Sequence, residues 1–183
     1  RRSYAQLHRL SLVLAFLARR VFKYRLQVIR GNIERSFPER DKEWHLRTER
    51  DYYLHFADIT VESIKHFSID NETALSRMKH LNTEVFEPFF KAGRSVLIAG
   101  GHLNNWELYA VTSNQNVPHD VMAVYKKLSD PVMDKAVRTS RQRFGLEMVR
   151  TVDAQDWMKA NAQGPNPKAI VMGFDQSPAN PDK

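Results

Sequence analysis

The sequence of 183 residues contains no cysteine. This absence excludes a thiolate nucleophile, a disulfide framework and cysteine-ligated zinc. The histidines show no metal-ligand spacing either, so we expect neither a metal nor another cofactor. The chain also lacks a G-x-S-x-G element, which argues against a serine nucleophile on a strand-to-helix elbow.

Long apolar runs are missing as well. The longest candidate, residues 10–18, covers nine positions and is interrupted by Ser11. A helix that spans a bilayer needs about 18–20 apolar residues, and no cleavage site for a signal peptide follows the run. We therefore expect no membrane-spanning helix within the sequence. Whether such a helix precedes Arg1 is left open. The chain begins without Met and ends in a polar stretch, so we expect sequence to be missing at one or both ends.

Acidic residues are scarce at the start of the chain. Residues 1–35 hold nine Lys and Arg against one acid, Glu34, and so have a net charge of +8. Since the whole chain has a net charge of +7, residues 36–183 carry about −1. We interpret 1–35 as a basic segment and 36–183 as the body of the protein. A basic segment of this kind suits anionic lipid head groups, nucleic acid or an acidic protein.

The basic segment has helical periodicity. Apolar residues recur at alternating spacings of three and four, which predicts one amphipathic helix over 3–33. This stripe consists of Leu7, Leu10, Leu14, Leu17, Val21, Tyr24 and Val28. Between residues 10 and 18 the opposite side is apolar too, as in a helix that lies in a membrane interface. A core-packing helix with a solvated basic face is the alternative.

The remaining pattern predicts an α/β fold. Helices are expected over 41–66, with Asp41 as N-cap, and over 71–79. Short apolar runs at 95–99, 121–125, 146–149 and 169–172 then alternate with helical stretches at 105–115, 130–144 and 153–162. Strands that alternate with helices indicate a mainly parallel sheet flanked by helices. We therefore expect N-terminal helices leading into such a sheet, truncated at the C-terminus.

The chemistry points to the end of the first expected strand. Two glycines there precede His102, and Glu107 follows five residues later. On one helix these side chains would lie about 140° apart, but at a loop-helix junction the imidazole can fold back onto the carboxylate. A neutral imidazole can accept a proton from a hydroxyl, and a carboxylate on its other nitrogen orients it. The alternatives are a structural histidine and a capping box in which Asn104 pairs with Glu107.

Five segments in register resemble the bacterial lipid A late acyltransferases, the lauroyl and myristoyl transferases of the H-x4-D/E acyltransferase superfamily. They are NIERSFPE at 32–39, GHLNNWEL at 101–108, VYKKLSDP at 124–131, RQRFG at 141–145 and GFDQSP at 173–178. The corresponding family patterns are N-L-x-x-S-F-P-E, G-H-x-G-N-W-E-L, V-Y-R-P-L-x-N-P, R-x-R-F-G and D-Q-x-P. The resemblance implies a fold of the glycerolipid-acyltransferase type. Lys126 departs from the usual arginine, which weakens geometric selection of an anion, and Asn104 departs from the usual glycine.

The resemblance implies transfer of a fatty acyl chain, usually from acyl carrier protein, to a hydroxyl of a lipid A precursor. The reaction would take place at the cytoplasmic face of the inner membrane, with residues 1–35 on the membrane surface. His102 would be the general base and Glu107 its orienting partner. The residues expected to contact substrate are Lys126, Arg143, Asp175, Gln176 and Asn105.

Two other functions remain open. One keeps the same chemistry but uses acyl-CoA and another glycolipid or phospholipid. The other is a basic nucleic-acid-binding module with a merely structural His102. We expect no nucleic-acid partner, because the basic residues share their helix with apolar ones and no recognised nucleic-acid motif is present.

Overall fold

The computed structural model describes residues 3–161 and 166–175. The chain forms two compact units, Arg1–Lys65 and His66–Lys183. The change in charge falls at residue 35, but the long helix that follows packs against the basic segment and so belongs to the first unit.

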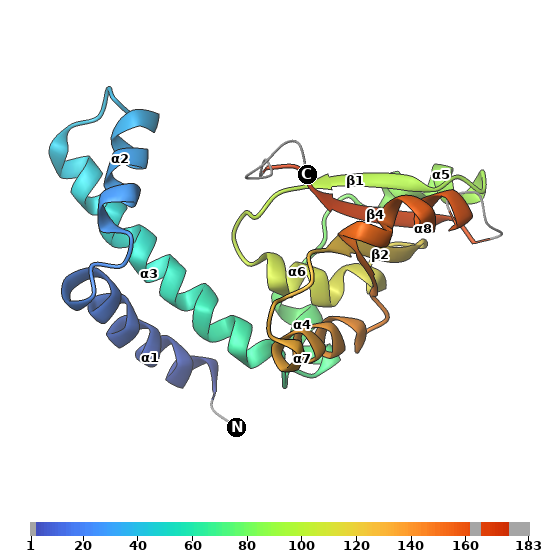
Figure 1. The fold of residues 1–183 in the computed structure, drawn as a ribbon, viewed down its shortest axis with the longest axis horizontal. Helices are drawn as coiled ribbons and strands as arrows, with labels where there is room; N and C mark the ends of the chain where they lie inside the picture. The colour runs from blue at the N-terminus through green and yellow to red at the C-terminus, as the bar shows by residue number, and fades with distance from the viewer. Residues whose placement is uncertain (1–2, 162–165, 176–183) are drawn as a thin grey trace. The chain divides into compact units, whose positions relative to one another are not determined.

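The first unit is helical. It contains α1 (Tyr4–Phe16), the π-helical turn η1 (Leu17–Val21), α2 (Leu26–Ser36) and α3 (Lys42–His66), as Figure 1 shows. The predicted start of α3 is confirmed, since the Asp41 carboxylate accepts a hydrogen bond of 2.7 Å from the backbone N–H of Trp44. None of the helices among the described residues is long and apolar enough to cross a membrane.

The prediction of a single helix over 3–33 is wrong. Lys23 and Arg25 have φ values of 49° and 51°, and non-glycine residues in this left-handed region do not continue an α-helix. The Tyr24 N–H donates to the carbonyl of Ala18 at 2.8 Å, and the Tyr53 hydroxyl donates to the carbonyl of Tyr24 at 2.7 Å. These bonds close a turn between η1 and α2.

The core of the first unit uses small side chains where the expected stripe had large ones. Ala15 and Ala18 pack with Tyr53 and Ala57 of α3. Small side chains allow helices to approach closely. Of the expected stripe, Leu7 is buried and Leu14 packs against this core, while other large residues face outward. The exposed large apolar residues of α1, η1 and the turn that follows are Leu10, Leu12, Val13, Phe16, Val21, Phe22 and Tyr24.

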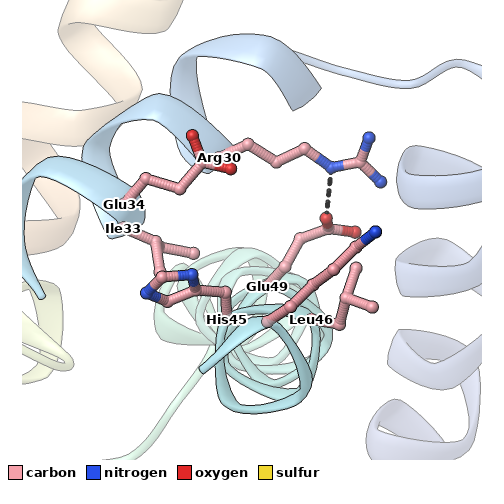
Figure 2. Close-up of a pocket in the computed structure, with 7 residues that line it drawn as sticks. Arg30, Ile33, Glu34, His45, Leu46 and Glu49 are labelled. Carbon is pink, nitrogen blue, oxygen red and sulfur yellow. Dashed lines mark hydrogen bonds and ion pairs between the residues drawn. The ribbon is translucent and has the colours of Figure 1, made fainter. Parts of the chain in front are cut away.

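A buried carboxylate ties the helices of this unit together. Glu49 of α3 accepts hydrogen bonds from Arg19 Nε at 2.7 Å and from Arg30 Nε at 2.6 Å. Burial raises the pKa of Glu49, but the hydrogen bonds from Arg30 and Arg19 outweigh it, so the pKa lies below its ordinary value. Figure 2 shows Arg30 and Glu49 at the edge of a pocket of about 330 Å³ between α2 and α3, which Glu34 and His45 also line.

Glu49→Gln is expected to lower the free energy of unfolding by about 2 kcal/mol at pH 7, because it removes the charge that both guanidinium groups face. We set the value below that of a fully buried pair, since the Arg30 side chain is about half exposed. A lowered pKa means that this stability is present above the ordinary value of 4.5 and is lost as the pH falls through the lowered value. Urea unfolding at pH 7 and pH 4 measures it. The exposed control Glu39→Gln should change little, and equal midpoints for both variants would contradict the role of Glu49.

The second unit is an α/β layer structure. Before the sheet come α4 (Asn71–Arg77), η2 (Thr83–Phe86) and α5 (Glu87–Lys91). The sheet and its connections follow as β1 (Val96–Gly100), α6 (Trp106–Thr112), η3 (Ser113–Gln115), β2 (Asp120–Tyr125), α7 (Pro131–Gln142), β3 (Glu147–Arg150), η4 (Thr151–Asp153), α8 (Ala154–Asn161) and β4 (Lys168–Gly173). The expected α/β fold is confirmed, and the four strands lie within two residues of their predicted bounds.

All strands are parallel and pair in the order β1-β4-β2-β3. Successive residues of β2 enter different cores, as expected for side chains that point to opposite faces. Val121 packs with Ala110 of α6, and Met122 packs with Ala154 of α8. Helices thus cover both faces, and Figure 1 shows α4, α6 and α7 together on one of them. Because every strand runs the same way, the loops after all four strands meet at one edge.

Candidate functional site

The site is built where β1 and β4 end side by side. Gly100 and Gly173, the last residues of these strands, are partners in the parallel register. The Phe174 N–H donates to the carbonyl of Gly100 at 2.9 Å and so keeps the two strand ends together. His102 leaves the end of β1 and Asp175 leaves the end of β4, which brings residues 73 positions apart in sequence into contact.

Asp175 holds both the backbone and the ring of His102. One carboxylate oxygen accepts the His102 backbone N–H at 2.7 Å, and the other lies 2.9 Å from His102 Nδ1. An ionised carboxylate can only accept, so Nδ1 carries the proton and Nε2 is left as the proton acceptor. The side chains of His102 and Asp175 are 43% and 40% exposed, which leaves the pair open to a substrate.

The charge of Asp175 is stabilised by this contact. The hydrogen bond from the His102 backbone, followed by that from its side chain, lowers the pKa of Asp175 below its ordinary value. A carboxylate with a lowered pKa keeps its charge to a more acidic pH than a free aspartate does. We therefore expect the His102–Asp175 contact to persist well below neutral pH.

Two glycines make room for this pair. A Cβ on Gly101 would lie 3.4 Å from Asp175 Cγ, and one on Gly173 would lie 3.3 Å from His102 Cε1. The second distance is tighter than most real Cβ contacts, so a side chain there would displace the imidazole. By contrast, a Cβ on Gly100 would meet nothing nearer than the carbonyl oxygen of Met172 at 3.8 Å.

Gly173→Ala is therefore expected to lower by about tenfold the turnover of any reaction in which His102 transfers a proton, through a shift of the imidazole of a few tenths of an ångström. Gly100→Ala, one strand away in the same register row, is the matched control and should stay near the wild-type rate. Steady-state kinetics of the two variants measure the difference. Equal rates would show that the position of the His102 ring is not set by this contact.

The loop after His102 leads into α6 as the sequence suggested. Asn104 has φ 53°, a left-handed conformation that asparagine adopts more readily than most residues other than glycine. The Asn105 side chain then caps α6 by accepting the Leu108 N–H at 3.0 Å. The side-chain oxygen of Asn105 is thus used for the helix cap. The predicted contact of Asn105 with substrate stays a prediction. The His102 ring lies edge-on to that of Trp106, with their centroids 5.5 Å apart.

Glu107 has a different partner from the expected one. It lies in the first turn of α6, where Arg141 of α7 donates to its carboxylate from Nε at 3.1 Å and from Nη2 at 2.6 Å. No hydrogen bond joins His102 to Glu107 in the part of the chain that the structure describes. This bidentate hydrogen bonding by the Arg141 guanidinium orients the Glu107 carboxylate toward α7. Glu107 is not part of a capping box either, because Asn105, and not Asn104, caps α6.

Two other predicted residues, Lys126 and Arg143, lie apart from this contact. Lys126 is exposed in the loop after β2, at the same edge of the sheet as His102. Arg143 donates to the carbonyl of His66 at 2.8 Å and lies over the ring of Phe144, so its guanidinium contacts backbone and an aromatic ring. Gln176 lies outside the described residues. Substrate contacts of Lys126, Arg143 and Gln176 stay predictions.

Sequence reasoning missed Arg141 although it begins the quoted RQRFG segment. It also gave Asp175 only as a residue that contacts substrate, and not as the partner of His102. The signal that identifies the His102–Asp175 pair is the strand order, which places the end of β4 next to the end of β1 although the two strands are far apart in sequence. Among the described residues, no three His, Asp or Glu side chains come together as a metal site.

An imidazole with one nitrogen held by a carboxylate, at the carboxyl edge of a parallel sheet, defines a protein equipped for proton transfer to and from a bound substrate. The family of bacterial lipid A biosynthesis acyltransferases matches residues 3–165, and the chain belongs to this family. The resemblance expected from the five sequence segments is thus confirmed. Membership of this family identifies the protein as an acyltransferase. The match ends before β4, so the contact of Asp175 with His102 is a separate observation. A comparison with curated proteins finds no match.

Proposed function

We propose that the protein transfers a fatty acyl chain from an acyl thioester, usually that of acyl carrier protein, to a hydroxyl of a lipid A precursor. The observation that carries the proposal is the His102–Asp175 contact at the carboxyl edge of the sheet in a chain of this family. The imidazole is accessible and has one nitrogen available for a hydroxyl proton.

The residues support the following reaction. His102 Nε2 takes the proton of the acceptor hydroxyl as its oxygen attacks the thioester carbonyl, and Asp175 stabilises the imidazolium that forms. The C–S bond then breaks, and the leaving thiolate takes the proton from Nε2. Lys126 neutralises a phosphate of the acceptor as a point charge. Glu107 acts as a positioning residue, since its bond to Arg141 fixes the start of α6 beside the His102 loop.

Mass spectrometry of lipid A from cells that lack the gene tests the proposal. We expect one secondary acyl chain to be missing and to return with the wild-type gene but not with His102→Ala. Unchanged lipid A would contradict the proposed acceptor. An acyl chain lost from another glycolipid or phospholipid would instead support the acyl-CoA alternative.

We also propose that residues 1–35 lie on the cytoplasmic face of the inner membrane. The exposed apolar residues of α1 and η1 stand beside a basic run that includes Arg20, Lys23 and Arg25. Apolar insertion and attraction to anionic lipids reinforce each other on such a surface. A nucleic-acid role would need the charges alone.

The double change Phe16→Asp and Phe22→Asp is expected to reduce sedimentation with anionic vesicles about tenfold, because two exposed rings no longer enter the bilayer. Ile64→Asp, an exposed apolar residue of α3 outside the basic segment, is the control and should bind like the wild type. If the double variant bound both vesicles and a DNA duplex as well as the wild type does, the membrane role would be contradicted.

A further inference from the structure

Exposed apolar side chains follow every strand of the sheet at its carboxyl end. They are Leu103 after β1, Phe174 after β4, Leu128 after β2 and Val152 after β3, with exposures of 86%, 57%, 43% and 81%. Val132 in the first turn of α7 adds a fifth, at 74%. We call these five residues the carboxyl-edge rim.

The rim is held together by hydrogen bonds between its loops. Thr151 donates from its hydroxyl to the carbonyl of Tyr125 at 3.1 Å, which joins the ends of β3 and β2. The Leu128 N–H donates to the carboxylate of Asp134 at 2.9 Å, which joins the loop after β2 to α7. The bond between Phe174 and Gly100 does the same for β4 and β1. The rim is therefore a defined surface of this unit.

Single exposed apolar residues are common on protein surfaces and need no explanation. The second unit has others, such as Val85. What distinguishes the rim is that all four strands contribute to it. The residues directly before three of the strands, Ser95, His119 and Leu146, offer no counterpart, because Ser95 is polar and His119 and Leu146 are almost fully buried.

The charges on this edge favour an anionic surface. Asp175 is paired with His102, Asp153 with Arg150, and Asp130 caps α7. Lys126 and Lys127 are exposed next to Leu128 and are not among the residues that form an ion pair in the described part of the chain. Exposed apolar side chains on the same edge as exposed ammonium groups match a bilayer with anionic head groups, where the apolar atoms enter the interface and the lysines meet phosphates.

We propose that the carboxyl-edge rim docks directly on an anionic phospholipid bilayer, so that the His102–Asp175 pair faces the lipid from which its acceptor comes. The statement that docking brings the pair to its acceptor rests on the proposed function. The docking itself rests only on the exposed apolar and basic residues of this edge. It adds a second membrane contact, in the unit that carries the site, to the one proposed for residues 1–35.

The absence of cysteine allows a direct test on the full chain. Val152→Cys and, as matched control, Val85→Cys each receive an environment-sensitive fluorophore. Val85 lies beside Phe86, whose ring contacts His119 just before β2, so it reports from the opposite end of the strands. The probes are vesicles of phosphatidylethanolamine with phosphatidylglycerol, and vesicles of phosphatidylcholine alone.

We expect the label at position 152 to shift to the blue, and to be quenched by a quencher within the bilayer, on the anionic vesicles only. The label at position 85 should report water throughout. Val132→Asp combined with Val152→Asp should weaken binding to anionic vesicles about tenfold, with Val85→Asp unchanged. A label at 152 that stays in water on vesicles bound by the protein would overturn the proposal. So would shielding of that label by an acidic carrier protein and not by vesicles. The vesicles hold no acceptor, so these outcomes are independent of acyl transfer.

Discussion

His102→Ala is expected to lower the turnover of acyl transfer by about 10³-fold or more, because it removes the group that takes the hydroxyl proton. The fold should be unaffected, since the imidazole lies in an exposed loop and its removal opens no core cavity. The measurement is kcat with an acyl thioester donor and a lipid A precursor, alongside the unfolding midpoint in urea.

His55→Ala is the matched control, as His55 is an exposed histidine of the first unit. It should retain the wild-type rate. If His102→Ala also retained that rate, the imidazole would have no part in the chemistry, and the structural interpretation of His102 would hold.

Asp175→Asn should reduce kcat by about 10³-fold to 10⁴-fold, as loss of an orienting carboxylate does in hydrolases that rely on a comparable pair. The amide keeps the size of the side chain but removes the charge that stabilises the imidazolium. It can also donate to Nδ1 and so favour the wrong tautomer. KM should change much less than kcat, because Asp175 contacts His102.

Glu107→Gln separates the two possible partners of the imidazole. Its carboxylate accepts from Arg141, so we expect a fall in kcat of less than about tenfold and a loss of stability below about 1 kcal/mol, as for other partly exposed pairs. The reverse order, with Glu107→Gln inactive and Asp175→Asn nearly normal, would restore Glu107 as the partner of His102.

The fold could be predicted because short apolar runs alternate with amphipathic stretches. Val121 and Met122 illustrate why: adjacent residues of one strand both lie in a core, since helices cover both faces of the sheet. The first helix was predicted wrongly because periodicity does not report φ. Nothing in the types of Lys23 and Arg25 announces a left-handed turn, and the hydroxyl of Tyr53 that supports it comes from another helix.

The site was predicted in part. The position of His102 in a loop after β1 followed from the two glycines that precede it. The contacts of His102 and Glu107 did not follow, because each partner comes from a distant element. Asp175 reaches His102 only because β4 inserts next to β1, and Arg141 reaches Glu107 only because α7 packs against α6. Spacing along the chain carries no information on either contact.

Chemical rescue tests the central claim most directly. Imidazole added to His102→Ala should restore acyl transfer in proportion to its concentration, because the free base can enter the space beside Asp175 and accept the hydroxyl proton. Restoration should fail in the double variant His102→Ala with Asp175→Asn, where the carboxylate no longer orients the ring. A single variant that imidazole cannot rescue, or a double variant rescued equally well, would contradict the account.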